Sequence, residues 1–245
     1  LGRDIVEGWR FVGATPLLRG IVVGMLVAFA AGGVVLGLGR AFVTSLGAGD
    51  PGYGVVVMAV FVGVALGVWQ GPRWLSGLSR RRTFSLALST AGVCLVLVAL
   101  VHDIVVASLF VVALGLSTGL AYVSAYTLLG LEVDDTVRGR TFSFVGSSTR
   151  VVIIAVMLVA PWVANALGER TVSAGEHWSV TYSGAALAMV LAGLVTVVAG
   201  VVAHRQMNDR PGTSLREDLA AVFTRRTAPQ EDVRRPVREP GGFFL

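Results

Sequence analysis

Six apolar runs follow one another along this chain of 245 residues, with short polar turns between them. A helix needs about 20 mostly apolar residues to cross the hydrocarbon core of a bilayer. Within that core the backbone N–H and C=O groups must bond inside the structure, so only helices and closed barrels can cross it. We therefore predict an all-α membrane protein with six transmembrane helices. The predicted helices lie at residues 16–46, 53–75, 83–101, 104–131, 141–167 and 180–203.

The composition agrees with a membrane protein, because 54% of the residues are hydrophobic and only 14% are charged. A soluble domain carries about 25% charged residues. The net charge of +5 comes from arginines that gather mostly in the turns on one predicted side of the membrane, so we expect no nucleic-acid partner. The lone Cys94 lies in an apolar run and excludes an intrachain disulfide.

Two arginine-rich turns determine the expected orientation. Arg80, Arg81 and Arg82 follow the second apolar run, and Arg138 and Arg140 follow the fourth. Arginines beside hydrophobic spans mark the cytoplasmic face of a membrane. We therefore expect both ends of the chain in the cytoplasm, with inner turns near positions 79 and 136 and outer turns near positions 45 and 173.

The second arginine-rich turn also resembles a segment of a known family. Residues 133–143 read Val-Asp-Asp-Thr-Val-Arg-Gly-Arg-Thr-Phe-Ser. This segment resembles the loop between the fourth and fifth helices in the C-terminal half of major facilitator superfamily transporters. Residues 7–16 are similar to the cytoplasmic lead-in of that half, and the likeness continues to about Arg205.

The motif in this loop is matched only in part. The family's commoner form has Pro at the position of Asp134 and Glu at the position of Thr136. The residues that match are Arg138, Gly139 and Arg140.

A second loop of this family lies between the second and third helices, where a Gly, an Asp and several Arg pair with neighbouring helix ends during gating. The residues that resemble this pattern are Gly71, Arg73, Arg80 and Arg81. Ser76 and Gly77 stand where the family has an Asp-Arg pair. The arginines would then lack their usual carboxylate partner, which argues against an ordinary alternating-access gate.

The resemblance implies the C-terminal six-helix half of a major facilitator transporter, built as two inverted repeats of three helices. It implies a multi-pass protein of the bacterial inner membrane that transports or exports small molecules. Its partners would be the lipid bilayer and an N-terminal six-helix half outside this chain. No Asp or Glu lies within the six predicted helices, so we expect any proton coupling to rest on that N-terminal half.

Polar and charged side chains inside the predicted helices are the candidate transport residues. Burying a guanidinium in a membrane without a partner costs free energy, so an arginine there calls for a partner or a function. Arg150 lies about 15 Å beyond Arg140 along a helix, and we expect it to line a cavity or to bond to another helix. Arg40 either snorkels to the outer interface or has a functional role. The second half of the fourth helix is rich in polar side chains, which either an inner cavity or tight interhelical hydrogen bonding would explain. Its candidate residues are Tyr122, Ser124 and Tyr126.

Three glycines spaced by four residues predict a packing surface on the second helix. Gly63, Gly67 and Gly71 share one helix face. Small residues at this spacing let two backbones approach closely where lipid supplies no hydrophobic drive for association. We expect them to contact a neighbouring helix.

We expect the chain to divide into four parts: a cytoplasmic lead-in (1–15), the six-helix membrane domain (16–203), a cytoplasmic amphipathic helix with a charged linker (204–240), and the start of a following domain (241–245). The last part reads Gly-Gly-Phe-Phe-Leu and is similar to the opening of thymidylate kinases, which some bacterial proteins carry after a transporter-like membrane region. The alternative function is therefore a non-transporting membrane anchor for a fused dTMP kinase that would use ATP and magnesium. In the chain itself we expect no catalytic residue, metal or cofactor, because its sequence has no metal-binding cluster, no nucleophile triad and no complete phosphate loop.

Overall fold

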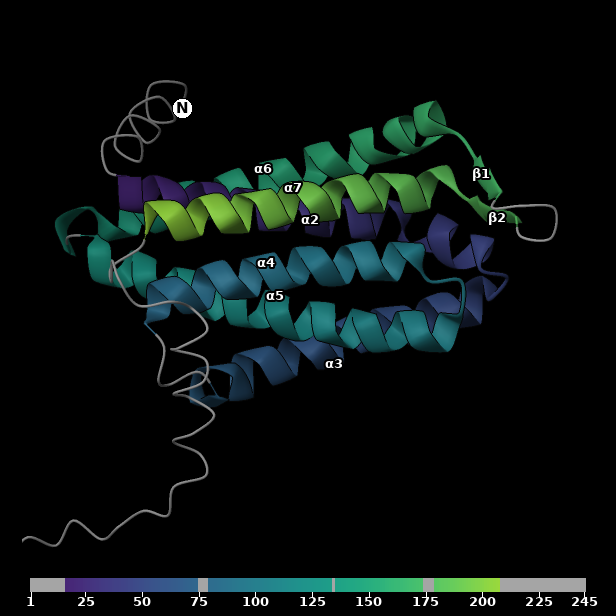
Figure 1. The fold of residues 1–245 in the computed structure, drawn as a ribbon. Helices are drawn as coiled ribbons and strands as arrows, with labels where there is room; N and C mark the ends of the chain where they lie inside the picture. The colour runs from purple at the N-terminus through teal and green to yellow at the C-terminus, as the bar shows by residue number, and fades with distance from the viewer. Residues whose placement is uncertain (1–15, 75–78, 134, 174–178, 208–245) are drawn as a thin grey trace, which may run out of the picture.

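The computed structural model describes residues 16–74, 79–133, 135–173 and 179–207. The described chain forms six long helices and one short antiparallel hairpin (Figure 1). In order, these are α2 (Pro16–Ser45), α3 (Gly49–Trp74), α4 (Arg80–Leu100), α5 (Ile104–Glu132), α6 (Asp135–Leu167), β1 (Arg170–Ser173), β2 (Ser179–Tyr182) and α7 (Gly184–Gln206). Each of the six helices is long and apolar enough to cross a membrane, which confirms the predicted fold class.

Polar side chains cap three of the helices at their N-terminal ends. The Ser79 hydroxyl accepts a hydrogen bond from the Arg82 amide (3.4 Å), and the Ser183 hydroxyl accepts one from the Ala186 amide (3.2 Å). The Asp103 carboxylate accepts bonds from two amides of the first turn of α5. These caps satisfy backbone donors that have no partner inside the helix, so each apolar helix begins at a polar residue.

The predicted ends of several helices were wrong because the helices continue into polar sequence. Helix α6 begins at Asp135, so Arg138, Gly139 and Arg140 lie in its first turns and not in a loop. Helix α4 likewise begins at Arg80. Arginine is a good helix former, and a helix that has crossed the hydrocarbon can extend into the water beyond it.

Two of the turns that were predicted to be on the outer side also differ from the prediction. The first turn is shorter than expected, because α3 begins at Gly49 and Pro51 lies in its first turn, where the missing proline N–H does no harm. Gly47 and Gly49 have positive φ angles (76° and 58°), which lets the chain reverse sharply here. In the second turn, the start of the predicted sixth helix belongs instead to β2, and α7 begins only at Gly184.

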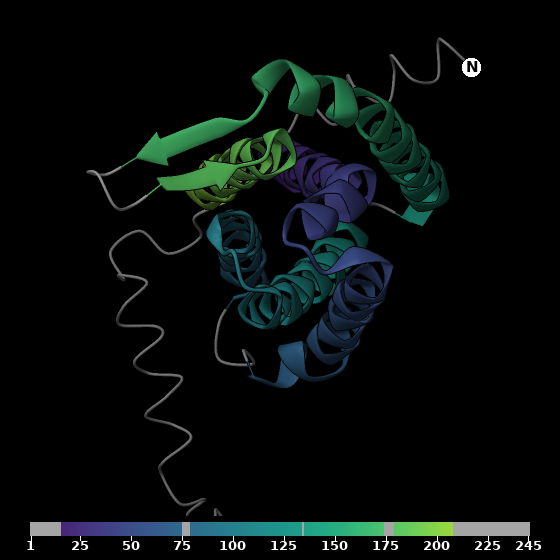
Figure 2. The same cartoon turned by 90° about the vertical axis from the view of Figure 1, so that its right-hand side faces the viewer.

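Each helix has particular neighbours within the bundle. Figure 2, seen along the helices, shows α4 and α7 side by side on one side, with α6 and α3 at the two other corners and α2 and α5 between them. The packing agrees, because α4 contacts α7 and α5, α3 contacts α5, and α2 contacts α6 and α7. We call the side of the bundle between α6 and α3, where α2 and α5 lie, the open face. The apolar stretches of α6 and α3 are the least buried of the six.

Glycines bring the backbones of neighbouring helices into contact. A Cβ atom on Gly63 would overlap the Val112 carbonyl oxygen, and one on Gly67 would overlap the Leu116 carbonyl oxygen, both in α5. Gly71 instead faces the side chain of Leu120, 2.7 Å from where its own Cβ would be. All three predicted glycines of α3 therefore lie against α5, which fixes the distance between these two helices.

Candidate functional site

Four aromatic rings form a continuous row across α2, α5 and α6. Phe29 of α2 meets Tyr122 of α5 edge to face, with ring centroids 6.4 Å apart. Tyr122 lies 4.6 Å from Tyr126, and Tyr126 lies 5.8 Å from Phe142 of α6. The Tyr122 side chain is 48% exposed although it lies within a transmembrane helix. The row therefore joins the three helices and leaves one tyrosine ring accessible on the open face.

Arg150 lies at the middle of α6, about 22 Å along the helix from Asp135 and about 25 Å from Leu167. Its side chain is exposed, and Ser147 and Ser143 are exposed on the same helix about one and two turns earlier. Within the described part of the chain, Arg150 makes no ion pair and no hydrogen bond. A guanidinium at this position is a candidate functional group, because charged side chains within membrane spans face a bundle interior or an aqueous cavity.

The packing of α2 on α6 places Arg150 at the level of Phe29, at one end of the aromatic row. Cβ atoms on Gly33 and Gly37 would lie 3.0 Å from the Ile153 and 3.2 Å from the Met157 carbonyl oxygens, so the two helices run in the same direction in close contact. Phe29 precedes Gly33 by one turn, and Arg150 precedes Ile153 by about one turn. Phe29 and Arg150 therefore lie at similar depth.

Other polar side chains of α5 do not take part in this site. Ser124 is only 7% exposed. The Thr118 hydroxyl donates to the Leu114 carbonyl (2.8 Å), and the Thr127 hydroxyl donates to the Val123 carbonyl (2.7 Å). These two threonines thus bond within α5 itself, and interhelical hydrogen bonding does not explain their presence.

Near the C-terminal end of α2, Arg40 pairs with Asp50 in the first turn of α3. The closest oxygen–nitrogen distance is 2.9 Å, and the side chains are 71% and 73% exposed. Both carboxylate oxygens receive a hydrogen bond from the guanidinium. Arg40 therefore has a carboxylate partner at the end of its helix. The sequence pattern did not predict this ion pair.

The arginine-rich ends of α4 and α6 both contact the last two turns of α5. Arg81 pairs with Glu132 at 2.7 Å, and Arg138 donates to the Gly130 carbonyl at 2.9 Å. Among the described residues, Arg73 donates a hydrogen bond to the Gln70 side chain, at 3.5 Å. The side chains of Arg80 and Arg140 are exposed. Contrary to the expectation from the missing loop acid, Arg81 does have a carboxylate, supplied by a different helix.

The six-helix arrangement and the arginine-rich helix ends agree with one known family. The Major Facilitator Superfamily model matches residues 17–239. The chain belongs to this superfamily. It is a membrane transporter domain of that family, and its six spans are consistent with half of the superfamily fold. No curated protein matches the chain.

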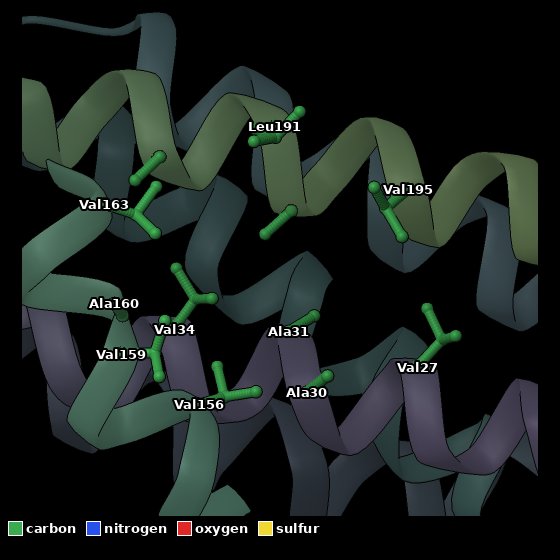
Figure 3. Close-up of a pocket in the computed structure, with 12 residues that line it drawn as sticks. Val27, Ala30, Ala31, Val34, Val156, Val159, Ala160, Val163, Leu191 and Val195 are labelled. Carbon is green, nitrogen blue, oxygen red and sulfur yellow. The ribbon is translucent and has the colours of Figure 1, made fainter. Parts of the chain in front are cut away.

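This major facilitator domain also has an apolar groove, formed by α2, α6 and α7 (Figure 3). Its volume is about 260 Å³. Alanine, valine and leucine side chains from the three helices line it, among them Val34, Val163 and Leu191. Because no polar side chain lines the groove, it offers nothing to orient a polar molecule. The aromatic row with Arg150 is therefore the better candidate for substrate contact.

Sequence reasoning missed several residues of the superfamily domain. Phe29 and Phe142 complete the aromatic row, but a phenylalanine in an apolar run gives no signal of its own. Glu132 and Asp50 are the partners of two predicted arginines, and each stands at a helix end, where acids are common. Arg82 is the most deeply buried of the described arginines, at 2% exposed. Nothing in the sequence indicated this burial, because Arg82 stands in a run of three arginines.

Proposed function

We propose that this chain is the C-terminal six-helix half of a major facilitator exporter of small molecules. Substrate would pass along the open face, between this half and an N-terminal six-helix half. The observation that carries the proposal is the row from Phe29 to Phe142, with Arg150 at the depth of Phe29, because a charge and an exposed aromatic ring then occur together at membrane depth.

The location proposed for the protein is the bacterial inner membrane, with both ends of this chain in the cytoplasm. One end of the bundle carries most of the described arginines, among them Arg73, Arg81, Arg138 and Arg205. This supports a cytoplasmic position for that end. The opposite ends carry Arg40 and Arg170, and Arg40 is paired with an acid.

Energy coupling would rest on the N-terminal half. The carboxylates of the described residues lie at or beyond helix ends, at Asp50, Asp103, Glu132, Asp135 and Glu169. A proton-coupled transporter usually carries a titratable group within a span, which can bind the proton and release it during transport.

The proposal is tested by flux through the full-length protein in sealed proteoliposomes. We expect at least one member of a panel of small amphipathic anions, cations and neutral compounds to cross faster than in protein-free vesicles. Flux should fall when Tyr122 is replaced by alanine, whereas Val198→Ala on α7 serves as a matched control at an exposed apolar position. Flux that equals the protein-free rate for every compound would argue against transport.

The second candidate function is a non-transporting anchor for a fused dTMP kinase. It is favoured by the Gly-Gly-Phe-Phe-Leu sequence at 241–245, which lies outside the described residues, and by the missing acid at the position of Ser76. Membranes containing the full-length protein should then convert dTMP and ATP to dTDP in the presence of magnesium, while the flux assay shows no transport. Without a Gly-x-x-x-x-Gly-Lys-Ser/Thr sequence in the protein, this candidate fails.

A further inference from the structure

We propose that Arg150 and Tyr122 form a binding site for an organic anion that carries an aromatic ring. The inference rests on the proposed transport function and adds the chemical class of the substrate. It concerns the part of the open face at the depth of Phe29, whose ring contacts Tyr122 of α5.

The charge of Arg150 is the first argument. Arg40 and Arg81 each pair with a carboxylate near a helix end. Arg150 lies at the middle of α6, and the described carboxylates are all at or beyond helix ends. A guanidinium in that position needs an anion or water as its partner. A ligand carboxylate or sulfonate can supply the anion through two parallel N–H···O bonds, which match the planar guanidinium.

The aromatic surface is the second argument. Tyr122 is half exposed. Its ring contacts the rings of Tyr126 and Phe29, with centroids 4.6 Å and 6.4 Å away, respectively. A ring fixed in this way loses little conformational entropy when a flat ligand stacks on it. Flat aromatic ligands should therefore bind better than saturated ligands of the same charge and size.

The placement of the two groups is the third argument. Phe29 contacts the Tyr122 ring, and Arg150 lies at the depth of Phe29, as the paired contacts along α2 and α6 require. In the proposed site, one small molecule contacts the ring and the guanidinium together. An aromatic cation would meet the same ring but would be repelled by the arginine.

The test measures equilibrium binding to the full-length protein in lipid nanodiscs. Four radiolabelled probes separate charge from ring: naphthoate, naphthylmethylammonium, naphthamide and decalin carboxylate. We expect saturable binding of naphthoate, with naphthylmethylammonium and naphthamide weaker by about tenfold, which is the ratio that one charge-assisted hydrogen bond brings. Decalin carboxylate should bind more weakly than naphthoate.

Variants assign the binding to the two residues. Arg150→Gln should weaken naphthoate binding by about tenfold and leave naphthamide binding unchanged, while Arg150→Lys retains part of the preference for the anion. Tyr122→Leu should remove the preference for naphthoate over decalin carboxylate. Arg170→Gln, which removes an arginine beyond the end of α6, is the matched control and should change nothing. Unchanged naphthamide binding also shows that the Arg150→Gln variant is folded.

Two results would overturn the inference: preferred binding of the cation, or naphthoate binding that Arg150→Gln leaves intact. The flux assay separates this failure from failure of the transport proposal. If the protein moves a cation or a neutral compound but no anion, transport stands and the assigned substrate class is wrong. If naphthoate binds through Arg150 but no compound moves, the site stands and transport is wrong.

Discussion

Arg81 and Glu132 join the first turn of α4 to the last turn of α5 through an ion pair of 2.7 Å. The Arg138 side chain, from α6, donates to the Gly130 carbonyl in the same turns of α5. Three helices are thereby connected at one end of the bundle, where the sequence motif alone predicted unpartnered arginines.

Loss of this pair should destabilise the domain by a modest amount. Each side chain is about one-third exposed, so we expect Glu132→Gln to lower the free energy of unfolding by about 1 kcal/mol. Thermal unfolding in detergent measures the change. Arg73→Gln is the control, because Arg73 is exposed and its hydrogen bond among the described residues is a long one to Gln70 of the same helix. The reversed pair, Arg81→Glu with Glu132→Arg, should restore part of the loss, and a double variant no better than either single change would contradict the pairing.

Packing of α3 on α5 gives a larger effect. Gly67→Val should destabilise the domain by at least about 2 kcal/mol, because the new side chain would overlap the Leu116 carbonyl oxygen in a backbone contact that cannot relax cheaply. Gly32→Val makes the same chemical change where no atom lies within 4 Å, and it should be tolerated. The yield of folded, monodisperse protein and its unfolding temperature are the measurements. Equal behaviour of the two variants would refute the close approach of α3 and α5.

Single cysteines test the proposed orientation. In a Cys94→Ala background, an impermeant thiol reagent added outside intact cells should label Glu169→Cys and should not label Arg73→Cys. Both positions are exposed at opposite ends of the bundle. Ser79 is less suitable, because its hydroxyl caps α4. After the membrane is opened, both variants should react. Labelling of Arg73→Cys in intact cells would reverse the topology.

The number of helices was predictable from sequence, but their ends were not. A bilayer requires about 20 apolar residues per span, so six such runs leave little choice of fold. The need to cross the hydrocarbon core sets a minimum length for each helix, but it does not determine where the helix ends in water. Helix α6 therefore begins as early as Asp135 and α4 as early as Arg80. The start of α7 was missed for a different reason, since Val180 and Tyr182 fit a strand as well as a helix.

The candidate site was predictable only where polarity marked it. Arg150 and Tyr122 stand out as polar residues within apolar runs, and the structure places them at similar depth through the contacts of Phe29. The partners of Arg40 and Arg81 depend on which helix ends meet, and no spacing within one helix contains that information. Ser124 was selected because of its neighbours in sequence, yet its side of α5 is buried.

Water access to the open face most directly tests the claim that substrate passes along it. The measurement is the rate at which a water-soluble, membrane-impermeant maleimide modifies Tyr122→Cys in the full-length protein in proteoliposomes, with Cys94 replaced by alanine. The matched control is Leu194→Cys on α7, because the two native side chains are 48% and 52% exposed in this domain. We predict that Tyr122→Cys reacts, that modification blocks flux, and that Leu194→Cys, which faces lipid, stays unmodified. If Tyr122→Cys does not react, or if Leu194→Cys reacts equally fast, the open face is not a path for substrate.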